Sequence, residues 1–268
     1  MIKSLRNLFM GLILAFLSAP LIVVAGVALN SRKMLLFPPQ GISLRWYGEL
    51  FTASEWLIPV KNSLFIAAGA SLLALSVALP LAYFLWRYRI FYARLLFSLG
   101  MSPFILPPVI TALGFLSFWV LAGFYGRMIA TVISHAIFFV TLPLVTLSLG
   151  FESIDREIVE AAETMGADSA SVFRTIILPM VRPYMISGCA FTFVLSLNEY
   201  IVAYMVAGFT VETLPIKIFN ALRYGYTPVM AAVAVVFVLL AALIFGLIGR
   251  FGDLPKLLGA INPEESKP

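Results

Sequence analysis

The sequence is poor in charge. Asp, Glu, Lys and Arg make up only 12% of its 268 residues, whereas soluble domains carry about 25%. Hydrophobic residues reach 62%, and the mean hydropathy is +1.02. This composition excludes an ordinary soluble domain and predicts an integral membrane protein. Its spans are expected to be helices, because lipid offers no hydrogen-bond partner to an unpaired backbone amide.

Reactive side chains are also scarce. The one cysteine, Cys189, has no partner for an intrachain disulfide and is interpreted as a small packing residue within an apolar run. With a single histidine, His135, a His/Cys metal site has no support, and no metal ligand is predicted. Lys61 and Ser63 resemble a Ser/Lys pair but flank the start of an expected helix. We therefore predict no catalytic residue and do not expect an enzyme.

A nucleotide-binding loop of the form Gly-x-x-x-x-Gly-Lys-Ser/Thr is missing as well. Such a loop cradles phosphates with its backbone N–H groups, so the chain is not expected to hold ATP itself, and no cofactor is predicted. The net charge of +5 does not indicate a nucleic-acid partner, because the Lys and Arg residues are scattered at the ends of apolar runs. We interpret them as determinants of membrane topology.

Apolar runs of membrane-spanning length dominate what is present. A spanning helix needs about 20 residues, and runs of that kind cover 8–29, 63–86, 95–121, 128–151, 184–207 and 229–249. We predict a single all-α transmembrane domain over 1–268 with six membrane helices and a polar insert over 152–183. The first run is interpreted as a membrane anchor, because it is longer than the apolar part of a typical signal peptide.

Charge predicts the orientation of these helices. With both termini in the cytoplasm, eleven Lys and Arg residues lie inside and seven outside, which agrees with the positive-inside rule. The prolines at 103, 107 and 108 predict a kink in the third run, which is either structural or lines a pathway. On the outer side, Ser43 is expected to cap a short amphipathic helix, with Trp46 and Trp56 in the interfacial aromatic belt.

The insert between the fourth and fifth runs has strong local signals. Asp155 is a helix N-cap residue, and Gly166 supplies a left-handed stop. Asp168 or Ser169 then caps a second helix, which is expected to end where Leu178-Pro179 turns the chain back to the membrane. The sequence therefore predicts a helix, a glycine turn and a helix on the cytoplasmic side.

The fixed positions of this insert carry a family resemblance. They are Glu160, Ala161, Ala162, Gly166, Ile176, Leu178 and Pro179. Their spacing resembles the EAA motif in the membrane subunits of ABC-type, binding-protein-dependent importers. The resemblance implies a type I (MetI-like) transmembrane domain, a permease subunit in the bacterial inner membrane, and an insert that acts as a coupling helix. These seven residues would then dock on a cytoplasmic ATPase dimer.

The resemblance also implies partners and a substrate. A second homologous permease, forming a heterodimer, and a periplasmic binding protein are expected. Further segments resemble the C-type permease of spermidine/putrescine importers: 44–47, 62–64, 134–135, 195–199 and 213–218. A polyamine or similar small cation is therefore the expected cargo, with opines, phosphonates or ferric ion as alternatives within the same class. A stand-alone channel or secondary transporter is the remaining alternative, but internal repeats and intramembrane charge pairs are not evident.

Two ionisable residues fall within the spans, where charge is costly and often functional. Glu199 and His135 are expected at similar depth below the outer surface, and Glu199 shares a helical face with Ser196. Together with Asn198, they are predicted to line the outer part of a path for a cationic substrate. Asn198 departs from the polyamine pattern, in which an acidic residue often stands at this place. Alternatively, Glu199 is an interhelical anchor hydrogen-bonded to a partner subunit.

Overall fold

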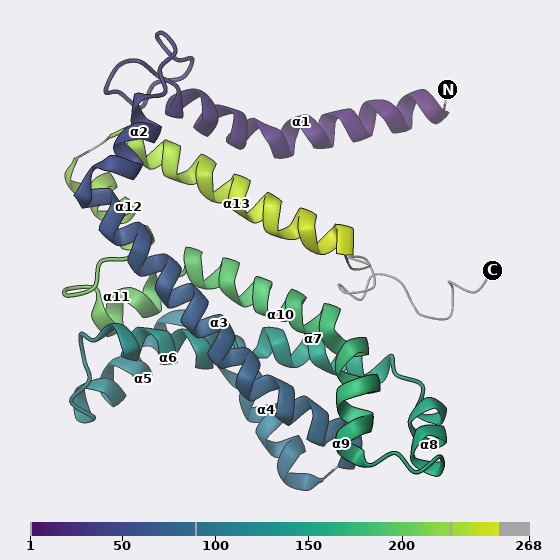
Figure 1. Ribbon diagram of the computed structural model, residues 1–268. Coiled ribbons are helices and arrows are strands. Elements are labelled where there is room, and N and C mark those ends of the chain that lie inside the picture. Colours follow the sequence, from purple (N-terminus) through teal and green to yellow (C-terminus); the bar gives the residue numbers. More distant parts are fainter. Residues whose placement is uncertain (1, 89, 226, 252–268) are drawn as a thin grey trace. The chain divides into compact units, whose positions relative to one another are not determined.

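The chain is helical along most of its length. The computed structural model describes residues 2–88, 90–225 and 227–251 (Figure 1). Its helices are α1 (Ile2–Ala28), α2 (Arg45–Thr52), α3 (Ser54–Tyr88), α4 (Phe91–Ile105), α5 (Pro108–Leu121), α6 (Met128–Phe139), α7 (Thr141–Glu152), α8 (Arg156–Thr164), α9 (Ser169–Val172), a π-helical segment (Phe173–Ile177), α10 (Leu178–Asn198), α11 (Ile201–Ala207), α12 (Leu214–Tyr224) and α13 (Val229–Phe251). Within the described ranges there is no β-strand, and one isolated bridge pairs Asn30 with Ile42. The predicted all-α class is confirmed.

The chain divides into two compact units. The first comprises Met1–Val60 and Ile216–Ala242, and the second comprises Lys61–Pro215 with the described part of Leu243–Pro268. In the first unit, the α2 side chain Trp46 is fully buried, and its Nε1 donates to the Asn30 carbonyl at 2.6 Å. Trp56 is also buried. The prediction that these two tryptophans lie in an interfacial belt is therefore wrong, because packing within the protein encloses them.

The second unit is built on an alanine stripe along α3. Ala70, Ala74, Ala78 and Ala82 recur every fourth residue and are all buried in one cluster. Their small side chains let neighbouring helices approach closely. The same cluster contains Leu144, Leu147 and Phe151 of α7 and, from the insert and the helix that follows it, Val159, Val172, Ile177 and Val181. The insert is thus part of the core of this unit and not a separate loop.

Close approach also fixes α7 against α10. A Cβ added at Gly188 would lie 2.7 Å from the Cα of Pro143, which is a backbone atom. A Cβ added at Gly150 would meet the Tyr184 ring at 2.8 Å. The distance between the two backbones therefore requires a glycine at position 188, and the Tyr184 ring leaves no room for a side chain at position 150.

Within the described residues, four helices are long and apolar enough to cross a membrane. They are Lys3–Ala28, Ser54–Tyr88, Ser169–Asn198 and Val229–Leu247. Two further pairs of helices pass the same test only as bent spans: α4 with α5, bent by 112°, and α6 with α7, bent by 44°. The described part of the chain thus has four to six candidate spans, and the number six stays a prediction.

The bend between α4 and α5 replaces the single helix expected over 95–121. Leu106 and Pro107 have extended backbones, with ψ of 147° and 133°. Pro107 and Pro108 have no amide hydrogen to continue the helical ladder, and a residue before proline is disfavoured in helical conformation. The tandem prolines therefore break the helix, a larger effect than the predicted kink.

Candidate functional site

The insert has the local structure that its sequence predicts. Asp155 caps α8 by accepting from the Glu157 N–H at 3.0 Å, and Gly166 follows with a φ of +89°. Asp168 caps the second helix by accepting from the Ser171 N–H at 3.3 Å. Hydrogen bonds from the Ser171 side chain and backbone lower the pKa of Asp168. A helix, a left-handed glycine and a capped second helix are therefore confirmed.

The end of the second helix differs from the prediction. Leu178-Pro179 does not turn the chain, because one apolar helix continues over Ser169–Asn198. A π-helical segment precedes the proline, and the Leu178 N–H donates five residues back to the Phe173 carbonyl. Pro179 lies in the first turn of α10, where its missing N–H is tolerated. The second helix of the insert is therefore continuous with the apolar span that follows it.

The seven motif positions divide by exposure. Four are exposed, namely Glu160, Ala161, Gly166 and Pro179. Three are half-buried, namely Ala162, Ile176 and Leu178, and of these Ala162 and Ile176 pack against the alanine-stripe cluster. One set is available to a partner, and the other holds the insert to the membrane helices.

Polar contacts also tie the insert to the end of α3. Arg87 forms an ion pair with Glu163 of α8 through its Nη2, and both side chains are about one-third exposed. Arg156 Nη2 donates to the Trp86 carbonyl at 3.2 Å, and Trp86 stacks on Phe151 with ring centroids 5.7 Å apart. Sequence reasoning missed this link because it interpreted Arg87 and Arg156 only as topology residues.

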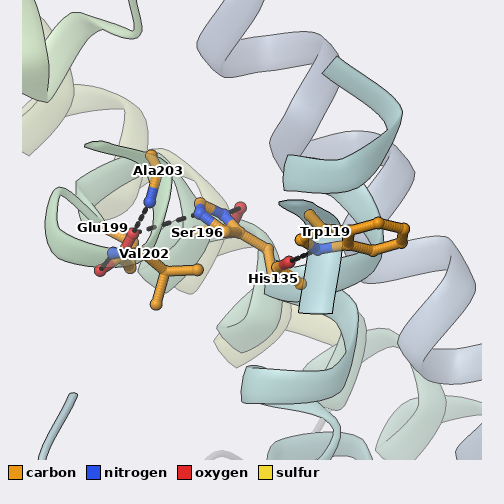
Figure 2. Close-up of polar contacts among 7 residues, drawn as sticks. Trp119, His135, Ser196, Glu199, Val202 and Ala203 are labelled. Atoms are coloured by element: carbon orange, nitrogen blue, oxygen red, sulfur yellow. Dashed lines mark hydrogen bonds and ion pairs between the residues drawn. The ribbon is translucent and has the colours of Figure 1, made fainter. Parts of the chain in front are cut away.

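A buried polar cluster lies where the fifth predicted span breaks. The expected helix over 184–207 ends at Asn198, and Glu199 is extended with ψ of 127° before α11 begins. Its carboxylate accepts from the N–H groups of Val202 at 2.8 Å and Ala203 at 3.0 Å (Figure 2). Glu199 thus satisfies two first-turn donors of α11 that would otherwise be unpaired in an apolar setting.

The histidine and a serine complete this cluster. His135 of α6 lies with its Nε2 3.2 Å from Glu199 Oε2 and its Nδ1 2.7 Å from Ser196 Oγ. The side chain of His135 is 1% exposed and that of Glu199 is 8% exposed. Ser134, the residue before His135, accepts at its Oγ from Trp119 Nε1 of α5 at 2.7 Å (Figure 2). The cluster therefore joins α6 to the break between α10 and α11, which lies 61 to 64 positions later in the sequence.

Not every predicted path residue joins the cluster. His135, Ser196 and Glu199 are brought together, whereas Asn198 is exposed and donates to the Val194 carbonyl of its own helix at 2.8 Å. Among the described residues, no group of three or more His, Cys, Asp or Glu side chains is arranged to hold a metal ion. In this conformation, both Glu199 oxygens face protein partners.

Comparison with known proteins identifies the family. Residues 70–253 match the model of the binding-protein-dependent transport system inner membrane component. The chain belongs to this family and is a multi-pass ABC transporter permease of the inner membrane.

Two of the relatives that the chain resembles are permeases of polyamine transport systems. The chain is 34% identical to the putrescine transport system permease protein PotI of Escherichia coli K12, covering 91% of this chain and 87% of that protein. It is 31% identical to the spermidine/putrescine transport system permease protein PotC of Haemophilus influenzae, covering 88% and 92%. A solved bacterial ABC transporter involved in alginate import has the same fold, with a TM-score of 0.68 at 17% identity, covering 93% of this chain and 96% of that one.

Proposed function

We propose that this chain is the permease subunit of an ATP-driven importer, that it forms half of a translocation path, and that the insert couples it to a cytoplasmic ATPase dimer. The main support is the insert itself. It exposes Glu160 and Ala161 beside the left-handed Gly166, while its other face packs into the membrane unit. An element held in this way moves with the helices when a partner pushes on it.

The partners of the proposal follow from the family. A binding-protein-dependent system uses a periplasmic binding protein, and a second homologous permease would supply the other half of the path in a heterodimer. ATP would be bound by the ATPase, which leaves this chain without a cofactor or catalytic role.

Co-purification tests the coupling role. The complete transporter is expressed with a tag on this chain, and the ATPase retained in detergent is quantified. Glu160→Arg and Gly166→Trp are expected to lose the ATPase, because they place charge or bulk on the exposed docking face. Glu152→Arg, a matched charge reversal at the last residue of α7 and outside the motif positions, is expected to retain it. Transport by the chain alone in liposomes would contradict the proposal and favour a stand-alone transporter.

For the cargo, we propose a polyamine of the putrescine or spermidine type. The support is the identity of 31–34% over most of the chain to permeases named for these substrates. Uptake of labelled putrescine and spermidine should depend on this chain in cells that lack other polyamine importers. Uptake of an opine, a phosphonate or ferric ion, without uptake of polyamines, would contradict the proposed cargo and leave the importer class unchanged.

For the buried cluster, we propose a positioning role for Glu199, supported by its two backbone hydrogen bonds and its contact with His135. In this proposal the anchor acts within one chain, in place of the predicted hydrogen bond to a partner subunit. The earlier prediction that Glu199, Asn198, Ser196 and His135 contact a cationic substrate requires the cluster to open in another state. Polyamine uptake by the Glu199→Gln variant, measured per folded molecule, separates the positioning role from substrate contact. A changed affinity for the polyamine supports substrate contact, and an unchanged affinity supports the positioning role.

A further inference from the structure

A cleft of about 320 Å³ lies beside the C-terminal end of α3, where α3 contacts α8 of the insert. Four helices contribute to its lining: Trp86 comes from α3, Arg94 from α4, Ser148 and Glu152 from α7, and Arg156 from α8. The apolar part of the wall continues along α3 toward Ala82. Trp86 and Arg156 also form the contact between α3 and α8, whereas Arg94 and Ser148 belong neither to that contact nor to the buried His135 cluster.

In the described part of the chain, the positive charges of the two arginines in the cleft are not balanced by nearby carboxylates. Across the described ranges, the Arg94 guanidinium has no hydrogen bond or ion pair, and its side chain is exposed. Arg156 donates to the Trp86 carbonyl and lies over the Trp86 ring at 5.7 Å, but has no carboxylate partner in the same ranges. Among the described lining residues, Glu152 is the one acid, and it is paired with neither arginine. The cleft therefore carries a net positive charge.

A further polar atom lies in the same wall. Ser148 Oγ is buried and has no hydrogen-bond partner among the described residues. A buried hydroxyl without a partner is uncommon, because its desolvation is not offset. Two guanidiniums without a carboxylate partner and an unpaired hydroxyl in one cleft match an oxygen-rich anion, since guanidinium groups bind phosphate oxygens through paired N–H donors.

We propose that this cleft binds the phosphodiester headgroup of an anionic phospholipid, with Arg94 and Arg156 on the phosphate and an acyl chain along the α3 wall. A lipid fits better than a soluble phosphate because the cleft joins an apolar surface at the end of a membrane-spanning helix. An indole at such an edge is typical of the membrane interface, and basic pockets between helices suit anionic headgroups. The site does not depend on the identity of the substrate.

Lipid retention measured by native mass spectrometry tests the proposal. The full chain is purified in detergent with its co-purifying subunits and incubated with phosphatidylglycerol, phosphatidylcholine or inorganic phosphate. We expect phosphatidylglycerol to be retained over phosphatidylcholine at equal concentration. Arg94→Gln should weaken that retention about tenfold, because a charge-assisted bidentate contact is lost. Arg94→Lys keeps the charge and should weaken it less.

Arg174→Gln is the matched control, because Arg174 is exposed on the π-helical segment and does not line the cleft. It should retain phosphatidylglycerol like the unmodified chain. Equal retention of both lipids by the unmodified chain would overturn the proposal without any variant. Unchanged retention in Arg94→Gln, an equal loss in Arg174→Gln, or binding of inorganic phosphate without lipid would overturn it as well.

Discussion

At the scale of single residues, Glu199 shows how a helix is interrupted within an apolar span. The break between α10 and α11 frees backbone donors, and an unpaired donor in a lipid-like environment is costly. Glu199 offers acceptors to the first turn of α11 and a contact to His135, which is 64 positions away in the sequence. The carboxylate therefore stabilises the break and joins it to α6.

Glu199→Gln is expected to destabilise the protein by about 1 to 3 kcal/mol, the range for leaving a buried partner unsatisfied. The amide keeps one oxygen as an acceptor. Its NH₂ group replaces the second carboxylate oxygen and leaves one of the two backbone N–H donors without an acceptor. Thermal unfolding in detergent measures the loss. Asn198→Ala is the control, because Asn198 is exposed and bonds only within α10, so its change should stay within about 0.5 kcal/mol. Equal melting temperatures for the two variants would contradict the capping role.

At the scale of elements, the insert is held to α3 as well as being continuous with α10. The Arg87–Glu163 pair and the Arg156–Trp86 contact join α8 to the end of α3. A push on α8 is therefore expected to move α3 together with α10. The side chains of the ion pair are about one-third exposed, so solvent screening limits the pair's contribution to stability to about 1 kcal/mol or less.

Reversing the charges of this pair should affect coupling more than stability. In the complete transporter, Arg87→Glu and Glu163→Arg are each expected to lower the ratio of uptake to ATP hydrolysis, because like charges push α8 away from α3. The swapped double variant should restore much of that ratio. Uptake and hydrolysis are measured on the same proteoliposomes. Normal ratios in the single variants, or no recovery in the double variant, would show that the pair does not transmit movement.

The contact between α7 and α10 gives a second prediction at this scale. Gly188→Ala should destabilise the protein by about 1 to 3 kcal/mol, the range for overpacking, because the added methyl group meets the Pro143 backbone. Gly114→Ala is the matched control, since a Cβ there has nothing within 4 Å. The control should be neutral or slightly stabilising, because alanine favours a helix. Thermal unfolding in detergent measures both variants. Equal melting temperatures for Gly188→Ala and Gly114→Ala would contradict the packing argument.

Local signals in the sequence were sufficient for part of this architecture. Asp155, Gly166 and Asp168 predict their caps and turn correctly, because each acts on its own nearest backbone groups. The break at Glu199 could not be predicted in the same way, since no proline or glycine marks it and His135 comes from a distant helix. The burial of Trp46 likewise depends on the Asn30 carbonyl, a partner that neither periodicity nor composition identifies.

At the scale of the whole molecule, the bend between α4 and α5 decides the topology. If this pair crosses the membrane, six spans place the insert on the same side as the N-terminus. If the pair is re-entrant, the chain returns to the cytoplasmic side after α5. The span formed by α6 and α7 then runs outward and leaves the insert outside. The positive-inside count and the coupling role both require the first arrangement. The turn after α5 and the start of α9 should then lie on opposite sides.

Single cysteines in a Cys189→Ala background test this arrangement. Tyr125→Cys, in the exposed turn after α5, is expected to react with a membrane-impermeant maleimide added to intact spheroplasts. Ser169→Cys, at the exposed start of α9, should react only after the membrane is permeabilised. The Cys189→Ala chain without a new cysteine controls for background labelling. The reversed pattern, with Ser169→Cys labelled from outside, would make α4 and α5 re-entrant and would place the insert out of reach of any cytoplasmic ATPase.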